Sequence, residues 1–233
     1  MKAVILAGGY GTRLAEETKL KPKPLVKIGK KPIIWHLIKI YSFYGIKEFI
    51  ICLGYKGSLL KKELNKLNSK KKWNLKYVNT GLKTMTGGRV KRIKKFVSKE
   101  DNFCLSYGDG LSDVNIKNLI KFHKKNKKIA TLTAVRPPAR FGAIKIRGNF
   151  VNYFKEKSKV DEGWINGGFF VLEPKIFDFI KNDKTFFERE PLEKTSKSNN
   201  LCAFKHEGFW QCVDTKRDRD RIDKLLKEKK IKL

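Results

Sequence analysis

The stretch Val4–Leu14, VILAGGYGTRL, stands near the start of the chain and decides what kind of fold follows. Its four apolar residues Val4–Ala7 predict a buried strand that runs directly into a turn with three glycines. Glycines allow a tight turn and bring bare N–H groups close to an anion. Arg13 adds a fork of donors that suits phosphate oxygens. The stretch therefore predicts a strand followed by a polyphosphate cradle.

Two lysines braced by prolines lie a few residues further on, in Lys21–Pro24. Because proline fixes φ, these lysines project from a backbone with little freedom. The dinucleotide fingerprint needs a third glycine where Thr12–Leu14 has none, and the ATPase P-loop needs a Gly-Lys-Ser/Thr ending that is also absent. The pattern indicates a polyphosphate site of another class.

The length and composition of the chain fit one large α/β domain, 1–233. Of its 233 residues 40% are hydrophobic, and no apolar run is long enough to span a membrane. A strand begins at once, so no signal peptide is expected. The cysteines are scattered without a Cys-x-x-Cys pair, which favours a reducing cytosol and no metal site built on sulfur. We therefore expect a cytoplasmic protein without membrane insertion.

The formal net charge of +31 is extreme. Its lysines are spread over nearly every predicted helix, with no basic tail, and arginine, the better reader of phosphates and bases, is much rarer. We interpret the charge as a lysine-biased surface that draws anionic substrates, and expect no specific nucleic-acid partner. Loose association with nucleic acid should fade with salt.

Strand-like and helix-like runs alternate along the first part of the chain. This order predicts a doubly wound, mostly parallel, Rossmann-like mixed sheet. The expected strands are Val4–Ala7, Phe49–Leu53, Leu75–Val78, Phe103–Ser106 and Ile129–Val135. The expected helices are Pro32–Gly45, Leu59–Leu67, one with Val90, Ile93 and Val97 on a single face, and Ile116–His123.

The pattern changes after Pro137-Pro138, where short strand runs follow one another. Ala143–Ile146, Val151–Lys155 and Phe169–Leu172 are expected to form a small antiparallel extension over the carboxyl edge of the sheet, where ligands bind in open α/β folds. Helices are expected at Ile176–Ile180, at Glu190–Ser196 and over 216–230.

Two aspartates each follow a predicted strand. Asp109 lies between Gly108 and Gly110 after the strand at Phe103, and Asp214 ends a second strand run, Phe209–Val213. A carboxylate at the end of a buried strand is well placed to hold Mg²⁺ beside a nucleotide. The alternatives are a turn aspartate for Asp109 and a helix N-cap for Asp214.

The glycine turn with Thr12–Leu14 and the Pro-Lys element resembles the signature of the sugar-1-phosphate nucleotidyltransferases. The resemblance implies a GT-A-like fold, catalytic roles for Arg13 and Lys23, and Mg²⁺ held by Asp109 and Asp214. It divides the chain into a nucleotide-binding half, about 1–136, and a sugar-binding half, about 137–215. The implied nucleotide-binding residues are Leu6, Ala7, Gly8, Gly9, Gly11, Thr12, Thr80, Thr86, Gly87, Gly88, Arg89 and Asp109.

Three further segments resemble the sugar-side elements of that family. Phe141-Gly142-Ala143 resembles one of them, and Glu156-Lys157 resembles the family's Glu-Lys-Pro element, with Ser158 in place of the proline. Asn166-Gly167 resembles its sugar-contacting segment. An Asn-Gly hairpin turn is the alternative for the latter. The implied sugar-phosphate-binding residues are Tyr107, Gly142, Ala143, Glu156, Lys157, Asn166 and Gly167.

The segment Met85–Arg89, Met-Thr-Gly-Gly-Arg, is predicted to open a helix, and it narrows the resemblance. Together with the segments around Asp109, Asn166 and Asp214 it is similar to the glucose-1-phosphate cytidylyltransferase branch of the family. This implies CTP and glucose 1-phosphate as substrates and a homo-oligomer, although a peripheral insertion of that branch is missing near Asn68–Lys72. Two alternatives stay open: the same reaction with another nucleotide or another sugar 1-phosphate, or a non-catalytic homologue. The histidines have no ligand spacing and no expected catalytic role.

Overall fold

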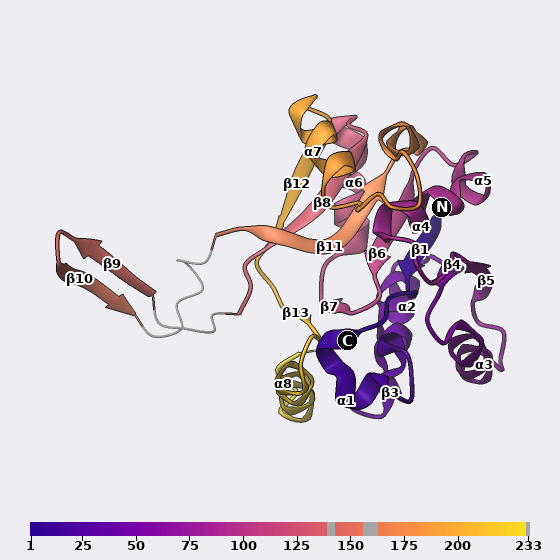
Figure 1. The fold of residues 1–233 in the computed structure, drawn as a ribbon, viewed down its shortest axis with the longest axis horizontal. Coiled ribbons are helices and arrows are strands. Elements are labelled where there is room, and N and C mark those ends of the chain that lie inside the picture. Colours follow the sequence, from indigo (N-terminus) through magenta and orange to yellow (C-terminus); the bar gives the residue numbers. More distant parts are fainter. Residues whose placement is uncertain (139–142, 156–162, 232–233) are drawn as a thin grey trace.

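The computed structural model describes residues 1–138, 143–155 and 163–231, and a seven-stranded mixed sheet forms its body (Figure 1). From edge to edge the strands are β12 (Leu201–His206), β8 (Ala130–Val135), β11 (Ile165–Leu172), β6 (Phe103–Tyr107), β1 (Lys2–Leu6), β4 (Glu48–Leu53) and β5 (Asn74–Asn79). The last four run parallel to one another, β12 is parallel to β8, and β11 is antiparallel to both of its neighbours. The predicted mostly parallel, doubly wound sheet is confirmed.

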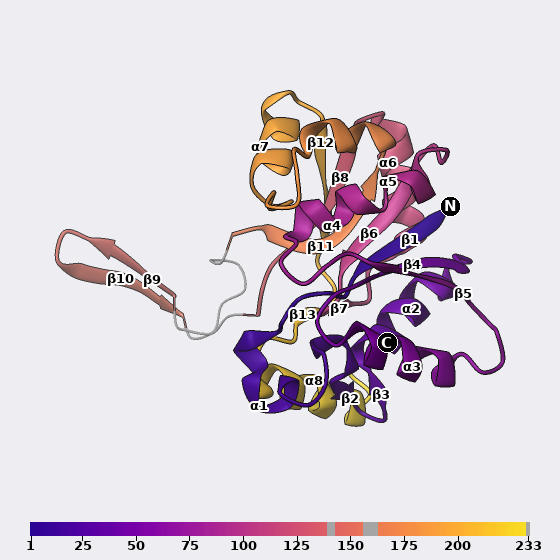
Figure 2. The same cartoon turned by 45° about the vertical axis from the view of Figure 1, so that its right-hand side comes forward.

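Helices cover both faces of this sheet (Figure 2). Side chains alternate along β1, so Ala3 and Ile5 enter one core while Val4 and Leu6 enter the other. The first core is closed by α2 (Ile33–Phe43), α3 (Gly57–Leu67) and α6 (Ile116–Asn126). The second is closed by α4 (Thr86–Arg92), α5 (Lys94–Val97), a 3₁₀ helix at Pro174–Phe179, and α7 (Glu190–Lys197).

The placement of β11 corrects one prediction. We expected Phe169–Leu172 in an extension over the sheet, but this segment pairs with β6 on one side and β8 on the other. All four of its side chains are at most 1% exposed, because alternate residues enter the two cores. The Asn166-Gly167 pair is part of β11 and not a hairpin turn, and the register shifts between Asn166 and Phe170.

The other two runs of the expected extension form an antiparallel hairpin, β9 (Ala143–Arg147) and β10 (Phe150–Lys155). It stands away from the body in both ribbon views (Figures 1 and 2). Apolar side chains are exposed on it, with Ile146 63%, Phe150 79% and Phe154 67% accessible. We call this hairpin the arm. A two-stranded hairpin with exposed apolar side chains is marginal by itself in water.

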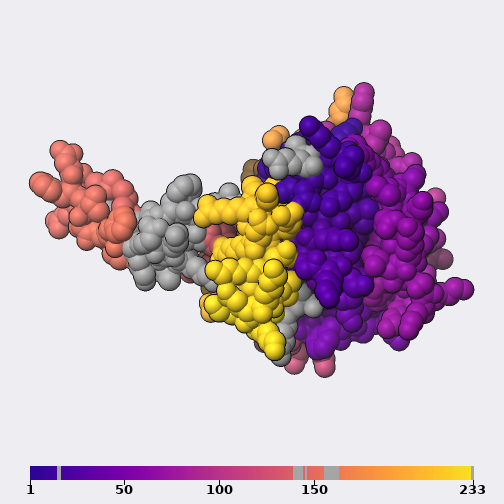
Figure 3. Space-filling view, turned by 90° about the horizontal axis from the view of Figure 1, so that it is seen from below, coloured from indigo at the N-terminus to yellow at the C-terminus, as the bar shows by residue number. Residues whose placement is uncertain are grey.

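The carboxyl-terminal helix α8 (Lys216–Lys227) packs beside the amino-terminal segment, as the space-filling view shows (Figure 3). The Gly29 N–H donates to Asp223 at 2.6 Å, and Arg219 pairs with Glu17. None of the helices that the structure describes is both long and apolar enough to cross a membrane. The remaining elements are α1 (Ala15–Thr18), β2 (Lys27–Ile28), β3 (Lys31–Pro32), β7 (Gly110–Ser112), β13 (Trp210–Cys212) and two 3₁₀ turns, Thr12–Leu14 and Lys23–Leu25.

Candidate active site

The glycine turn follows β1 at the carboxyl end of the parallel strands. Gly11 has φ +69°, a value that favours glycine, and the 3₁₀ turn Thr12–Leu14 follows, closed by a hydrogen bond from Leu14 N to Gly11 O at 3.0 Å. Position 8 needs glycine for a different reason from Gly11, because a Cβ there would collide with the Arg89 guanidinium beneath the turn. The turn therefore rests on a buried cation.

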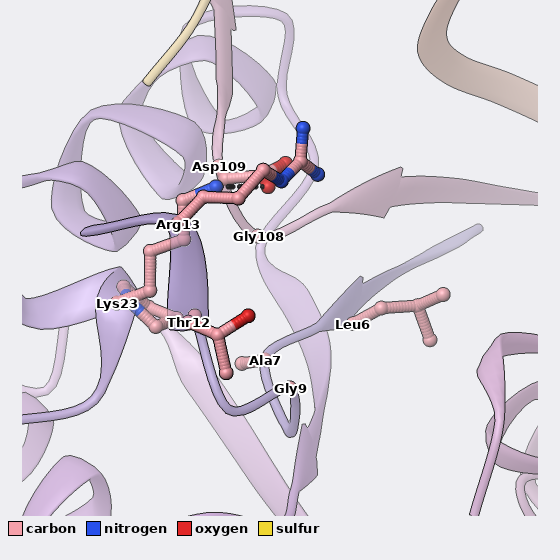
Figure 4. Close-up of a pocket in the computed structure, with 10 residues that line it drawn as sticks. Leu6, Ala7, Gly9, Thr12, Arg13, Lys23, Gly108 and Asp109 are labelled. Atoms are coloured by element: carbon pink, nitrogen blue, oxygen red, sulfur yellow. Dashed lines mark hydrogen bonds and ion pairs between the residues drawn. The ribbon is translucent and has the colours of Figure 1, made fainter. Parts of the chain in front are cut away.

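Lys23 joins two carboxylates that are far apart in the sequence. Pro22 is extended and Pro24 lies inside the short 3₁₀ turn, so the backbone directs the 8% exposed Lys23 inward. Its Nζ donates to Asp109 Oδ2 at 2.7 Å and to Asp214 Oδ1 at 2.6 Å. In Figure 4 the ammonium meets Asp109 above the glycine loop. Three segments thus converge at one point.

Charge dominates this cluster. Burial alone would lower the pKa of the Lys23 ammonium, but the carboxylates of Asp109 and Asp214 raise it. Burial would likewise raise the pKa of Asp214, but Lys23, followed by Arg13, lowers it. Arg13 Nη1 lies 2.5 Å from Asp214 Oδ2 while its side chain stays 73% exposed. Lys23 is therefore charged and held, whereas Arg13 remains accessible to a ligand.

The cluster includes a group of side chains that could hold a metal ion. One ligand atom each of Asp109, Cys212 and Asp214 lies within 4.8 Å of the others. Carboxylate oxygens are the ligands that Mg²⁺ prefers. Burial, followed by the two aspartates, raises the pKa of the Cys212 thiol far above its usual range, so the sulfur stays protonated. The two carboxylates therefore suit a hard divalent cation, and the thiol adds no anionic ligand.

Thr215, not Asp214, caps α8. The Thr215 hydroxyl accepts from Asp218 N at 3.2 Å, and Asp218 Oδ2 accepts from Thr215 N at 2.9 Å, which completes a capping box. The alternative interpretation of Asp214 as the N-cap is therefore wrong, and its carboxylate faces Lys23 instead.

A cavity of about 860 Å³ extends from this cluster along the carboxyl edge of the sheet. It reaches past the aspartates to the start of β11, where Trp210 Nε1 donates to Gly167 O at 2.7 Å. A smaller pocket of about 230 Å³, lined by Arg13, Lys23 and Asp109 among others, is drawn in Figure 4. The predicted site residues that line one or both are Leu6, Ala7, Gly8, Gly9, Gly11, Thr12, Arg13, Lys23, Thr86, Arg89, Tyr107, Asp109, Asn166, Gly167 and Asp214.

Three predicted nucleotide-binding residues have structural partners instead. Gly87 N and Gly88 N both donate to Thr185 O, at 2.9 and 3.3 Å, and a Cβ on either glycine would meet the segment that carries Thr185. Thr80 is fully buried and donates to Leu53 O at 2.7 Å. Close packing explains both glycines, and their N–H groups are already paired within the protein.

Arg89 both lines the large cavity and is buried with partners inside the protein. It is only 5% exposed and donates to Thr80 Oγ1 at 2.7 Å and to Gly81 O at 2.8 Å. Burial, the largest effect, lowers the pKa of its guanidinium. Its position supports the floor of the glycine turn.

Part of the predicted sugar side lies outside the described residues. Gly142, Glu156 and Lys157 fall there, and for Ala143 the structure describes only the backbone, at the start of β9. Of the predicted sugar-side residues, Tyr107, Asn166 and Gly167 are brought together. Asn166 Nδ2 lies 3.4 Å from the Tyr107 hydroxyl.

The structure also adds residues that sequence reasoning missed. Glu188, Phe186 and Trp210 line the large cavity. Trp210 lies within the recognised segment that ends in Asp214. Glu188 and Phe186 belong to a loop between the 3₁₀ helix and α7 that carries no motif, so no sequence signal pointed to them.

This fold and this cluster define a class of protein. The chain belongs to the nucleotidyl transferase family, whose model matches residues 2–218. It is 49% identical to the glucose-1-phosphate cytidylyltransferase of Salmonella typhimurium, over 99% of this chain and 97% of that protein. It is 40% identical to the probable glucose-1-phosphate cytidylyltransferase of Bacillus subtilis, over 97% of this chain and 96% of that protein.

Solved structures agree on the fold. A putative glucose-1-phosphate thymidylyltransferase from Bacillus anthracis superposes with a TM-score of 0.77 at 21% identity, covering 100% of this chain and 97% of that one. The recognised family and the predicted nucleotidyltransferase fold are both confirmed.

Proposed function

We propose that this chain transfers a cytidylyl group from CTP to α-D-glucose 1-phosphate, giving CDP-glucose and pyrophosphate. The observation that carries the proposal is the 49% identity to a glucose-1-phosphate cytidylyltransferase over nearly the whole chain. The Lys23 cluster, at the end of a cavity large enough for a nucleotide sugar, supports the same chemistry.

The reaction needs little acid–base help from the protein. A phosphate oxygen of glucose 1-phosphate attacks the α-phosphorus of CTP, and the bond to the bridging oxygen of pyrophosphate breaks. A phosphate monoester has a second pKa of about 6, so the nucleophile is already anionic at neutral pH. Catalysis is then positioning and charge neutralisation.

The cations of the cluster supply that neutralisation. The exposed guanidinium of Arg13 is placed to stabilise the leaving pyrophosphate. Lys23, held on Asp109 and Asp214, contacts the α-phosphate as negative charge develops there. N–H groups of the glycine turn bind the remaining phosphate oxygens.

We assign Asp109 and Asp214 as the side chains that hold Mg²⁺, because they bring two hard oxygen ligands together. When bound, the ion would screen the charge of the phosphate oxygens. The carboxylates also hold Lys23 in place, as the structure shows directly.

The remaining assignments concern the substrate halves. We propose that residues of about 1–136 bind the nucleotide and that about 137–215 bind the sugar phosphate, within one domain. Asn166 and Gly167 line the shared cavity and support the second assignment, and Tyr107 from the first half lines it with them. We predict that Glu156 and Lys157 also bind the sugar phosphate.

We also propose a cytoplasmic homo-oligomer. The described cysteines are free thiols, which suits a reducing compartment. The apolar side chains exposed on the arm favour an interface in which a second copy of the chain buries them.

Pyrophosphate release with Mg²⁺ and glucose 1-phosphate, run in parallel with CTP, UTP, dTTP, ATP and GTP, tests the activity. Release with CTP alone is expected. Release with another nucleotide would retain the chemistry and reject the base assignment. No release with any of these nucleotides, and none when other sugar 1-phosphates replace glucose 1-phosphate, would favour a non-catalytic homologue.

A further inference from the structure

An acidic side chain lies in a cavity that must receive anions. Glu188 lines the large cavity together with Arg13 and Arg89, although polyphosphate would repel its carboxylate. A carboxylate in such a cavity is tolerated where the ligand offers hydrogen-bond donors in place of phosphate. Sugar hydroxyls are such donors, and an ionised carboxylate accepts strongly from them.

Glu188 is held in place by neighbours. Thr86 Oγ1 donates to Glu188 Oε2 at 2.6 Å, and Thr86 Oγ1 itself accepts from Phe187 N at 2.9 Å. Phe187 is fully buried, with its ring centroid 5.5 Å from that of Phe170 in β11. The backbone before Glu188 is thus anchored in the core, and its carboxylate is oriented by a hydroxyl at the start of α4.

The same carboxylate is linked to the sugar side of the cavity. Tyr107 and Glu188 both line this cavity. Burial first, and then Glu188, raise the pKa of the Tyr107 hydroxyl, which therefore stays protonated. Asn166 Nδ2 lies 3.4 Å from that hydroxyl. The Tyr107 ring packs against Gly168, which has φ +77° and no room for a Cβ. Glu188 therefore lines the same cavity as the paired side chains of Tyr107 and Asn166.

We infer that Glu188 is a substrate-binding residue that accepts a hydrogen bond from a hydroxyl of the hexose, and so helps to select the sugar phosphate. The inference rests on the proposed function for the identity of the sugar. The acceptor and donor groups of Glu188, Tyr107 and Asn166 in this cavity suit a pyranose, which presents neighbouring hydroxyls that both donate and accept. The cytosine amino group and the ribose hydroxyls are the competing donors, and the experiment separates them from the hexose.

The test is Glu188→Gln, which keeps the shape and removes the charge. We expect KM for glucose 1-phosphate to rise about tenfold, the worth of one charge-assisted hydrogen bond, with KM for CTP nearly unchanged. The matched control is Glu193→Gln, the same substitution at an exposed position of α7. Thermal unfolding of both variants shows whether the fold is retained.

A hydroxyl scan identifies the bound group. Calorimetry measures how tightly deoxy analogues of glucose 1-phosphate bind to wild type and to Glu188→Gln, without turnover. We expect one analogue to bind wild type more weakly and to lose nothing further in the variant, the non-additivity that marks a direct contact. Additive losses for every analogue, or a rise in KM for CTP instead, would overturn the inference.

Failure of the proposed function gives a different result. If wild type releases no pyrophosphate from CTP and glucose 1-phosphate but does so with another pair, the activity assignment is wrong. The scan is then run with that pair's sugar phosphate, and the comparison of wild type with Glu188→Gln still decides the role of Glu188.

Discussion

Lys23 shows at the scale of one residue how a motif becomes a site. Proline on each side directs its side chain inward, and two carboxylates from distant segments meet its ammonium. Each partner follows a strand after one intervening residue, Asp109 after β6 and Asp214 after β13. The sequence indicated all three residues, but only the folded chain shows that one lysine touches both acids.

Replacing Lys23 by alanine should lower kcat by about 10²–10³ with the fold intact, because the variant loses the cation that faces the developing charge. Steady-state pyrophosphate release measures this. Lys21→Ala is the control, since Lys21 pairs with Glu17 outside the cluster. Near-normal turnover in the Lys23 variant would contradict its catalytic role.

Arg89 acts at the same scale, but from beneath the glycine turn. Arg89→Met should lower the free energy of unfolding by about 3 kcal/mol, because acceptors on Thr80 and Gly81 lose their buried donor. Arg92→Met removes a largely exposed ion pair and should cost about 1 kcal/mol or less. Urea unfolding measures both. Equal costs would show that burial of Arg89 is not what stabilises the turn.

At the scale of elements, β11 decides how the two halves of the sheet join. It enters antiparallel between β6 and β8, so its first residues arrive beside the ends of the parallel strands. Asn166 and Gly167 reach the cavity for this reason. The run itself is strongly apolar, but its partners are distant in sequence, and strand order depends on such long-range pairing.

The contact between α6 and β8 contains a buried histidine. His123 Nδ1 lies 2.9 Å from Thr131 Oγ1, and burial, followed by the charge of Lys124, lowers the His123 pKa from 6.5 to about 4. Between these values the unfolded chain binds more protons at this site than the folded chain. The free energy of unfolding should therefore fall as pH falls through this window.

Unfolding titrations at several pH values check this. His123→Asn should flatten the dependence between pH 6.5 and 4.5 by up to about 1.4 kcal/mol per pH unit. Wild type and variant should run parallel from pH 7 to 8, where the histidine is neutral in both states. Parallel curves across the acid window as well would show that His123 does not carry the effect.

The arm is the feature that only the whole molecule reveals. β9 and β10 pair with each other, and their apolar side chains remain exposed beyond the body (Figure 1). The sequence predicted both strands but placed them over the sheet. The strand pairing of this hairpin, among the residues that the structure describes, is local, and its own sequence does not specify where it rests.

If a second copy covers the arm, a double variant Phe150→Ser/Phe154→Ser should shift the protein to a smaller mass in light scattering coupled to size-exclusion chromatography. Removing two large exposed rings takes away much of the apolar area for association. Phe43→Ser is the control, since Phe43 is 81% exposed at the end of α2 on the body. A monomeric wild type would reject the homo-oligomer.

The sequence by itself determined the class of fold and the family, and it indicated Arg13, Lys23 and the two aspartates as site residues, because each depends on local patterns: strand runs, a glycine turn and proline-braced lysines. The tertiary structure decided the place of β11, the partners of Gly87 and Gly88, and the presence of Glu188 in the cavity. These depend on which distant surfaces pack together. Packing is set by the whole core, and no short segment carries it.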